Sequence, residues 1–255
     1  MEATSFYIPK PNKLKPQGED AHFICQHRQI FGIADGVGGW ARKGIDAGEY
    51  ARELMANSVT AVHRQPQEEV DPKVILKEAY LNTEARGSST ACILTLNGHI
   101  LHAVNVGDSG FILIRDGKVA YKSPTQQHGF NCPYQLGNTK DDPSVAEELK
   151  ISVIPGDIVV AGTDGLFDNL HDWEIGIIVR LFLGTTKPSN KLAWKIAQEA
   201  CERSGKKFAL TPFAMASSKA GRQFMGGKID DITVVVAFIL RGQESAKEEK
   251  EEDPR

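Results

Sequence analysis

The sequence lacks long hydrophobic runs, paired cysteines and an excess of charge of either sign. No run of about 18 apolar residues is present, so no membrane span is predicted. The four cysteines are far apart and form no C-x-x-C pair, which argues against a zinc site or a secreted disulfide framework and favours a reducing, intracellular compartment. Thirty basic residues against 33 acidic ones give a net charge of -3, and no basic stripe is interleaved with aromatics, so no nucleic-acid partner is expected.

The two ends of the sequence differ in composition from the part between them. Residues 1–17 show neither an apolar signal core nor an Arg/Ser-rich amphipathic stretch, so no targeting segment is predicted, and three prolines predict an extended N-terminal arm. Residues 243–255 are charged throughout and are expected to form a disordered acidic tail. No internal repeat or low-complexity linker interrupts residues 18–242, which predicts a single domain.

Secondary-structure signals along this domain favour the α+β class. Apolar segments rich in Ile and Val predict strands at 22–34, 90–97, 100–107, 110–115, 149–153, 157–162 and 231–240. Helical patterns cover 46–62, 72–86, 172–183 and 189–204. The segment LTLNGHILHAVNVGDSGFILIRDGKV is interpreted as a meander with turns at Asn97-Gly98 and Asp116-Gly117, which predicts antiparallel sheets covered by helices.

Acidic residues recur at the ends of the predicted strands. Asp35, Asp108 and Asp164 each end an apolar strand and precede Gly or Ser, and Asp230 stands where the last strand begins. One Asp-Gly pair is ordinarily only a turn, but several carboxylates at strand ends can converge on one point. Their mutual repulsion would raise their pKa values unless a cation offset it. Because the candidate ligands are oxygen and not Cys or His, the pattern predicts a site for Mg²⁺ or Mn²⁺.

Six motifs in order resemble the metal-dependent serine/threonine protein phosphatases called type 2C. They are GEDAHF, ADGVGGW, GSSTAC, VNVGDSG, GDIVVAGTDGLFDN and DDITVVV, within residues 19–240 apart from the first glycine. The resemblance implies a central β-sandwich with helices outside. The motifs DGVGGW, QQHGFN and TDGLFDN are most similar to the compact branch found in plant and fungal organelles, which implies a chloroplast or a mitochondrion.

The resemblance also implies roles for individual residues at two core metal ions. Asp35 would bridge the two ions, Asp164 and Asp230 would complete the shell of one, and Glu19 with the carbonyl of Gly36 would bind the other. A water between the ions would attack the phosphate monoester without a phosphoenzyme, and the substrate would be a phosphoprotein bound by a monomer.

Three further acidic residues resemble outer positions of the family site. Asp20 would hold a metal-bound water instead of a metal, and Asp108 and Asp168, together with Asp164, match positions that bind a weaker third ion in some relatives.

The match departs from the family pattern at two positions. Many relatives carry His directly after the Asp-Gly pair as a proton donor, whereas this sequence has Val37. His128 is a candidate replacement. The commoner role for such a histidine is that of a polar or substrate-positioning loop residue. Relatives also use an arginine before the Glu-Asp pair to bind phosphate, and here Lys15 is the best-placed candidate. A solvated lysine on a mobile arm is an equally good interpretation.

The helix-rich segment 169–228 resembles the region that carries a flap beside the active site. Its residues Trp173, Ile177, Trp194 and Ile196 recur at helical spacing and are predicted to be core.

Two alternative functions fit the sequence less well. A catalytically inactive, partner-binding relative would typically have lost metal ligands, whereas the acidic positions are all present: Glu19, Asp35, Asp108, Asp164, Asp168 and Asp230. A calcium-stabilised interaction domain would need EF-hand-type spacing within one loop, which is absent.

Overall fold

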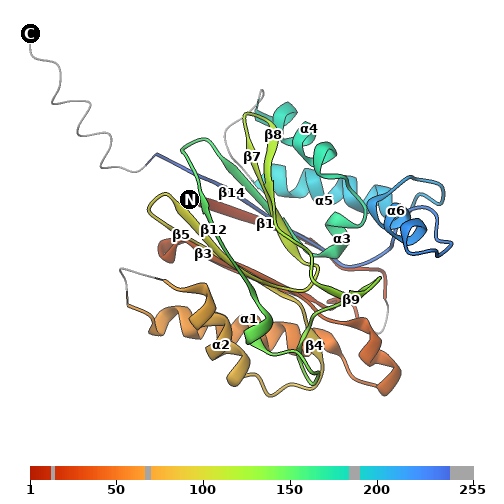
Figure 1. Cartoon of the computed structure of the whole chain (residues 1–255), viewed down its shortest axis with the longest axis horizontal. Helices are drawn as coiled ribbons and strands as arrows, with labels where there is room; N and C mark the ends of the chain where they lie inside the picture. The colour runs from red at the N-terminus through yellow and green to blue at the C-terminus, as the bar shows by residue number, and fades with distance from the viewer. Residues whose placement is uncertain (13–14, 67–69, 184–189, 242–255) are drawn as a thin grey trace, which may run out of the picture.

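Two antiparallel five-stranded sheets pack face to face in the computed structural model, which describes residues 1–12, 15–66, 70–183 and 190–241 (Figure 1). The first sheet has the order β1 (Glu2–Ile8), β14 (Ile232–Phe238), β13 (Ile158–Gly162), β7 (Gly110–Arg115) and β8 (Lys118–Lys122). The second has the order β12 (Glu147–Ser152), β6 (Ile100–Val106), β5 (Ala91–Asn97), β3 (Ile30–Asp35) and β2 (Asp20–Cys25). The α+β class and the helix-covered antiparallel sheets predicted from the sequence are confirmed.

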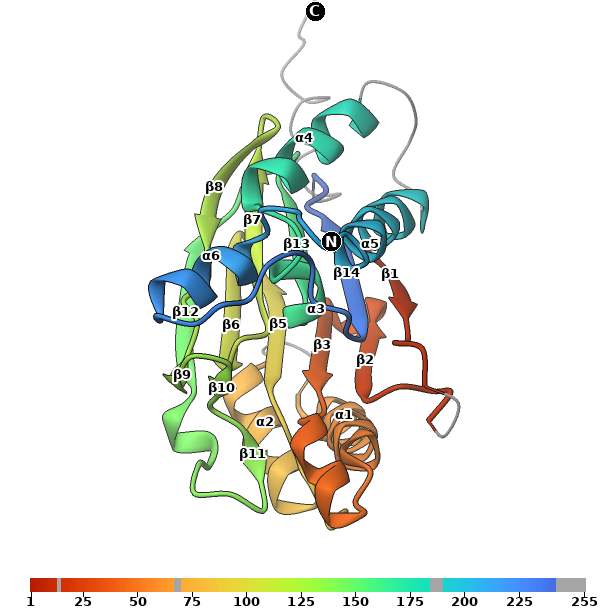
Figure 2. The ribbon, with the colours of Figure 1, turned by 90° about the vertical axis from the view of Figure 1, so that its right-hand side faces the viewer.

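Helices cover the outer face of each sheet (Figure 2). The second sheet is covered by α1 (Ala47–Arg64) and α2 (Pro72–Leu81), and the first by α4 (Asp172–Leu183) and α5 (Asn190–Ser204). Two short helices, α3 (Asp164–Phe167) and α6 (Pro212–Lys219), lie toward one end of the sandwich (Figure 1). None of the described helices combines the length and the hydrophobicity that crossing a bilayer requires.

Short elements complete the chain between these helices and strands. They are the 3₁₀ helices Gln26–Arg28, Gly38–Lys43 and Pro143–Val145, and the strands β4 (Ser88–Ser89), β9 (Gln127–Gly129), β10 (Cys132–Pro133) and β11 (Leu136–Gly137).

The hydrophobic core has three layers because strand side chains alternate between the two faces of each sheet. On β14, Val235 and Ala237 face the opposite sheet, whereas Val234 and Val236 pack under α4 and α5. A third layer lies between the second sheet and the helices α1 and α2. Since β14 is buried on both faces, its run of apolar residues does not alternate with polar ones.

One predicted strand was wrong, and the strands of the predicted meander are present but divided between the two sheets. The segment 22–34 is not one strand but the hairpin β2–β3, in which Gln29 adopts a left-handed conformation with φ of 53°. The expected meander is two hairpins, β5–β6 in the second sheet and β7–β8 in the first. The chain crosses between the sheets at Gly107, whose φ of 101° and close approach to Tyr134 O suit glycine alone.

The N-terminal segment belongs to the first sheet instead of forming an arm outside the domain. Residues 2–8 pair with β14 from Glu2 opposite Phe238 to Ile8 opposite Ile232. The prolines that suggested an arm begin only at Pro9, after the strand has ended. Helix α2 stops at Leu81, short of the predicted residue 86. The predicted tail 243–255 lies outside the described residues.

Candidate metal centre

The strand-end carboxylates meet at one end of the sandwich. Asp35 ends β3, Asp164 opens α3 directly after β13, and Asp230 stands just before β14. Asp108 lies where the chain crosses from β6 to β7. These four residues, with Gly36, line one cavity of about 370 Å³. The sheet topology therefore brings together side chains that are up to 195 positions apart in the sequence, from Asp35 to Asp230.

Crowding of like charges changes the acidity of these groups. Burial, followed by the charges of Asp164, Asp20 and Asp230, raises the pKa of Asp35 well above its ordinary value. Burial and the charge of Asp164 likewise raise the pKa of Asp108 to about 7. Burial also opposes ionisation of Asp164, but Lys228, together with a hydrogen bond from Asp35 and the charge of Lys10, lowers the pKa of that carboxyl. A cluster with this surplus of negative charge is stabilised by any bound cation.

The donor set fits a hard divalent ion. Asp164 Oδ1 and Asp20 Oδ1 are buried and accept no hydrogen bond within the described part of the chain, so each has a lone pair available. The acidic groups in the lining are four aspartates, and carboxylate oxygens are ligands that Mg²⁺ and Mn²⁺ prefer. Among the described residues, no three acidic, histidine or cysteine side chains are grouped so that they could hold a metal ion as they stand. Lysine ammonium groups contact Glu19 and Asp164 instead.

Lys10 is a member of the centre that the sequence analysis missed. Its Nζ lies 2.8 Å from Glu19 Oε2, 3.1 Å from Asp230 Oδ1 and 3.2 Å from Asp231 Oδ2. A lysine among the N-terminal prolines gave no signal of this role, because its place depends on β1 pairing with β14.

Asp231 organises the backbone next to the centre and was also missed as a functional residue. It is 1% exposed and accepts hydrogen bonds from the hydroxyl of Tyr7 and the backbone N–H groups of Lys10 and Glu19. These contacts hold the first sheet's edge strand and the Glu19 segment against the loop that carries Asp230. The pair Asp230-Asp231 in the sequence was the available signal.

Asp20 binds protein hydroxyl groups with one of its oxygens. Its Oδ2 accepts 2.8 Å hydrogen bonds from Thr163 and Thr233, which stand next to Asp164 and in β14. This carboxylate thus ties β2 of one sheet to β13 and β14 of the other.

Gly36 and Gly165 allow unusually close packing of the backbone at the centre. A Cβ at Gly36 would lie 2.6 Å from Glu19 O, and one at Gly165 would lie 1.9 Å from Asp231 O. Any side chain at either position would separate the segments that carry the carboxylates.

The candidate outer ligands have protein partners. Asp108 Oδ2 accepts a 2.9 Å hydrogen bond from Gln127 Nε2, and Asp168 Oδ2 lies 2.8 Å from Lys228 Nζ. Lys228 also contacts Asp164 Oδ2, and its Nζ lies 3.3 Å from Asp230 Oδ2. Its position in GGKIDD, two residues before Asp230, is the only hint that the sequence contained.

Lys15 and His128, the two candidates for missing family functions, lie outside the cavity lining. Lys15 Nζ is 2.7 Å from Glu19 Oε1 and 3.2 Å from Asp46 Oδ1, so it neutralises Glu19 from the side. His128 Nε2 lies 2.9 Å from Asp141 Oδ2, and its ring stacks on Tyr134 with 4.1 Å between centroids. Among the cationic side chains, the cavity lining includes Lys10, Arg42 and Lys228.

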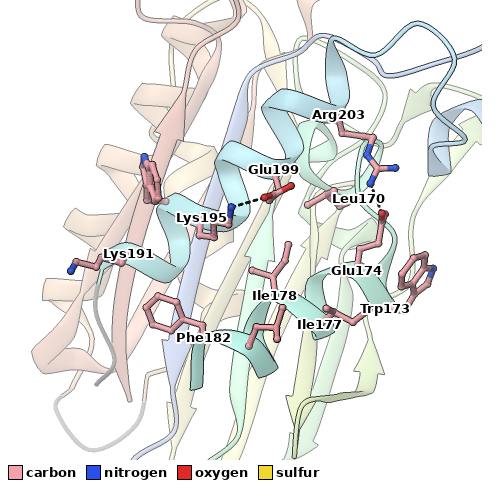
Figure 3. Close-up of a pocket in the computed structure, with 12 residues that line it drawn as sticks. Leu170, Trp173, Glu174, Ile177, Ile178, Phe182, Lys191, Lys195, Glu199 and Arg203 are labelled. Atoms are coloured by element: carbon pink, nitrogen blue, oxygen red, sulfur yellow. Dashed lines mark hydrogen bonds and ion pairs between the residues drawn. The ribbon is translucent and has the colours of Figure 1, made fainter. Parts of the chain in front are cut away.

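The predicted core assignment within 169–228 was wrong for three of four residues. Ile196 is fully buried, but Trp173, Ile177 and Trp194 are 61%, 38% and 45% exposed. Figure 3 shows Trp173 and Ile177 on the hollow between α4 and α5, which has a volume of about 920 Å³. The ion pair Arg203–Glu174 joins the two helices at one end of this hollow (Figure 3). Helical spacing identified apolar residues but not which side of each helix meets the sheet.

Comparison with known proteins identifies the family. A family model described as Stage II sporulation protein E (SpoIIE) matches residues 26–211. The Protein phosphatase PTC7 homolog of Xenopus laevis is 36% identical over 87% of this chain and 81% of its own length. The chain belongs to the protein phosphatase 2C family. Probable protein phosphatase 2C 55 of Arabidopsis thaliana is 49% identical over 95% of this chain, which spans 52% of that relative.

Solved structures share the fold of this 2C-family chain. The photosystem II phosphatase PBCP matches with a TM-score of 0.85 and 32% identity, over 93% of this chain and 98% of its own. The catalytic domain of the serine/threonine phosphatase PstP, solved in complex with two manganese ions, matches with a TM-score of 0.65 at 17% identity, which supports the fold alone. The chain spans between 32% and 58% of the length of three Arabidopsis relatives that it matches.

Proposed function

We propose that this chain hydrolyses phosphoserine and phosphothreonine in proteins, using two Mg²⁺ or Mn²⁺ ions. The observation that carries the proposal is the cavity in which Asp35, Asp164 and Asp230 meet beside Gly36 in a member of the protein phosphatase 2C family. Asp35 would contact both ions, Asp164 and Asp230 one of them, and Glu19 with the carbonyl of Gly36 the other. Bound ions would supply an activated water and would offset negative charge on the phosphoryl group.

The remaining groups of the cavity suit a phosphate monoester. Lys10, Arg42 and Lys228 are among the lining residues and supply positive charge in the same cavity as the carboxylates. Arg42 is exposed in the 3₁₀ helix Gly38–Lys43, so its guanidinium can reach a phosphate in the cavity mouth. The glycines Gly38 and Gly39 leave the backbone accessible to a bulky phosphoprotein chain. Lys15, which pairs with Glu19 and Asp46, is better suited to holding Glu19 in place than to binding phosphate.

Protonation of the leaving serine or threonine oxygen must come from a group other than residue 37, which is valine. His128 is paired with Asp141 and stacked on Tyr134, so its contacts favour a role in holding the loop 127–134 against the cavity. In the same loop, Asn131 and Pro133 reach the cavity lining. We therefore assign the segment 127–134 to positioning the substrate, and water to protonating the leaving oxygen.

An inactive, partner-binding relative is the alternative function, and the intact set of carboxylates disfavours it. The likeness to PBCP, a photosystem II phosphatase, supports a chloroplast protein as the substrate class. The test compares phosphate release from one peptide carrying phosphoserine, phosphothreonine or phosphotyrosine, with Mn²⁺ present. Release from the first two and not from the third supports the proposal; release from none would favour the inactive relative.

A further inference from the structure

We propose that the ammonium group of Lys228 is a built-in cation that takes the place of a third metal ion. The inference rests on the proposed metal-dependent function, because it concerns how many ions the same carboxylates bind. It differs from the expectation that Asp108, Asp164 and Asp168 would hold a weak outer ion. The side chain that carries this charge is 16% exposed, so it is well shielded from solvent.

The fold fixes Lys228 through its backbone. Asn169, which is fully buried, accepts a 2.9 Å hydrogen bond from Lys228 N and donates a 2.8 Å hydrogen bond to Lys228 O. The same amide donates to Gly165 O at 2.9 Å, so it locks the lysine to the turn that carries Asp164 and Asp168. These bonds fix the backbone of Lys228 beside that turn, within reach of its carboxylates, and the carboxylates then hold the ammonium group.

Three carboxylates from two segments surround the ammonium group. Lys228 contacts Asp164 Oδ2, lies 2.8 Å from Asp168 Oδ2 and lies 3.3 Å from Asp230 Oδ2. The ring of Phe213 covers it, with 5.1 Å between Nζ and the ring centroid. Three acidic partners match the three hydrogens of an ammonium group. An extra divalent ion at this point would have to displace a buried, paired charge.

Lys228 leaves one oxygen of Asp164 for a core ion. The lysine uses Oδ2 of Asp164, whereas Oδ1 of Asp164 is buried without a hydrogen-bond partner in the described structure. Asp230 contacts Lys10 through Oδ1 and Lys228 through Oδ2, so a core ion at Asp230 would displace Lys10 and leave Lys228 in place. The other expected outer ligand, Asp108, already accepts a hydrogen bond from Gln127. At the outer position, protein groups thus contact one oxygen of Asp108 and one oxygen of Asp168.

The test counts Mn²⁺ ions on the metal-stripped full chain by calorimetric titration and by elemental analysis after dialysis. Lys228→Met removes the charge, Lys228→Arg keeps it, and Lys73→Met is the matched control because it removes an ion-paired lysine in α2, away from the cavity. Wild type, Lys228→Arg and Lys73→Met should bind two ions. Lys228→Met should bind a third ion weakly, and its melting temperature in EDTA should be lower by about 5 °C or more, because three buried carboxylates lose their counter-charge.

The outcomes separate this inference from the proposed function. A third ion in wild type overturns the role of Lys228, and this result needs no variant. The same ion count and the same melting temperature in EDTA for wild type and Lys228→Met also overturn it, and would leave a contact with substrate phosphate as its role. If Lys228→Met fails to fold, Lys228→Gln is measured in its place. Wild type without bound Mn²⁺ overturns the proposed function itself.

Discussion

The hydroxyl of Tyr7 donates a 2.9 Å hydrogen bond to Oδ1 of Asp231, 224 residues further along the chain. This contact joins β1, the edge strand of the first sheet, to the loop that carries Asp230. Since Asp231 also holds the backbone of Lys10 and Glu19, the N-terminal strand is part of the support of the candidate metal centre.

Replacing Tyr7 by Phe should lower the free energy of unfolding by about 1 to 2 kcal/mol, because a buried carboxylate loses a donor. The affinity for Mn²⁺ should fall as well, since Glu19 and Asp230 lose part of their alignment. Urea unfolding in EDTA and Mn²⁺ titration measure the two effects. Tyr80→Phe, in α2 away from the centre, is the control and should change neither. If both variants had the same free energy of unfolding and the same Mn²⁺ affinity, the Tyr7 contact would stabilise neither the fold nor the metal centre.

Asp35→Asn should nearly abolish turnover without unfolding the protein, because one oxygen ligand would be weakened at both core ions. The metal-free variant should be at least as stable as wild type, since an amide avoids the burial of a carboxylate and the repulsion by neighbouring charges that together raise the pKa of Asp35. Steady-state kinetics with Mn²⁺ and thermal unfolding in EDTA check the two parts. Turnover within a few fold of wild type would contradict the bridging role.

The contribution of Asp108 and Asp168 to the stability of the metal-free protein should fall as the pH rises from about 4 to about 7. Burial raises the pKa of Asp108 and of Asp168 from 3.8 to about 7 in the folded protein, so over this range the folded state holds protons that the unfolded chain releases. The stabilisation by these groups is complete below the unfolded value and is lost as pH approaches 7. Binding of Mn²⁺ should show the opposite trend, because protons compete for the ligands.

Thermal unfolding in EDTA at a series of pH values measures this dependence. The double variant Asp108→Asn and Asp168→Asn is the control, because amides do not titrate and the slope should become flatter. A slope that stays the same in the double variant would assign the pH dependence to other groups.

Two substitutions, one in α4 and one in α5, distinguish a buried apolar residue from an exposed one. Ile196→Ala should lower the free energy of unfolding by about 2 to 5 kcal/mol, because it leaves a cavity under the first sheet. Trp173→Ala should cost less than about 1 kcal/mol, since its side chain is 61% exposed. Urea denaturation of both variants checks the difference. Similar losses would mean that Trp173 is packed in solution.

Most of the fold could be predicted because periodicity reports burial. The convergence of the strand-end aspartates could be predicted because Asp is unfavourable in strands, so its recurrence there stands out. Which strands pair with one another was harder to predict. Nothing local indicates that β6 and β7 belong to different sheets, because Gly107 redirects the chain only in contact with Tyr134 and Thr90. The residues missed at the site, Lys10, Lys228 and Asp231, are placed there by long-range strand pairing or by Asn169, neither of which leaves a pattern in neighbouring residues.

The dependence of phosphate release on bound metal tests the central claim most directly. The metal-stripped chain, with its metal content verified by elemental analysis, is assayed on a phosphothreonine peptide before and after addition of Mn²⁺ or Mg²⁺. We expect no turnover without metal and recovery as two ions bind per chain, because the candidate ligands, Asp35, Asp164, Asp230 and Glu19, all bind through oxygen. Full turnover in EDTA with no detectable metal would contradict the account.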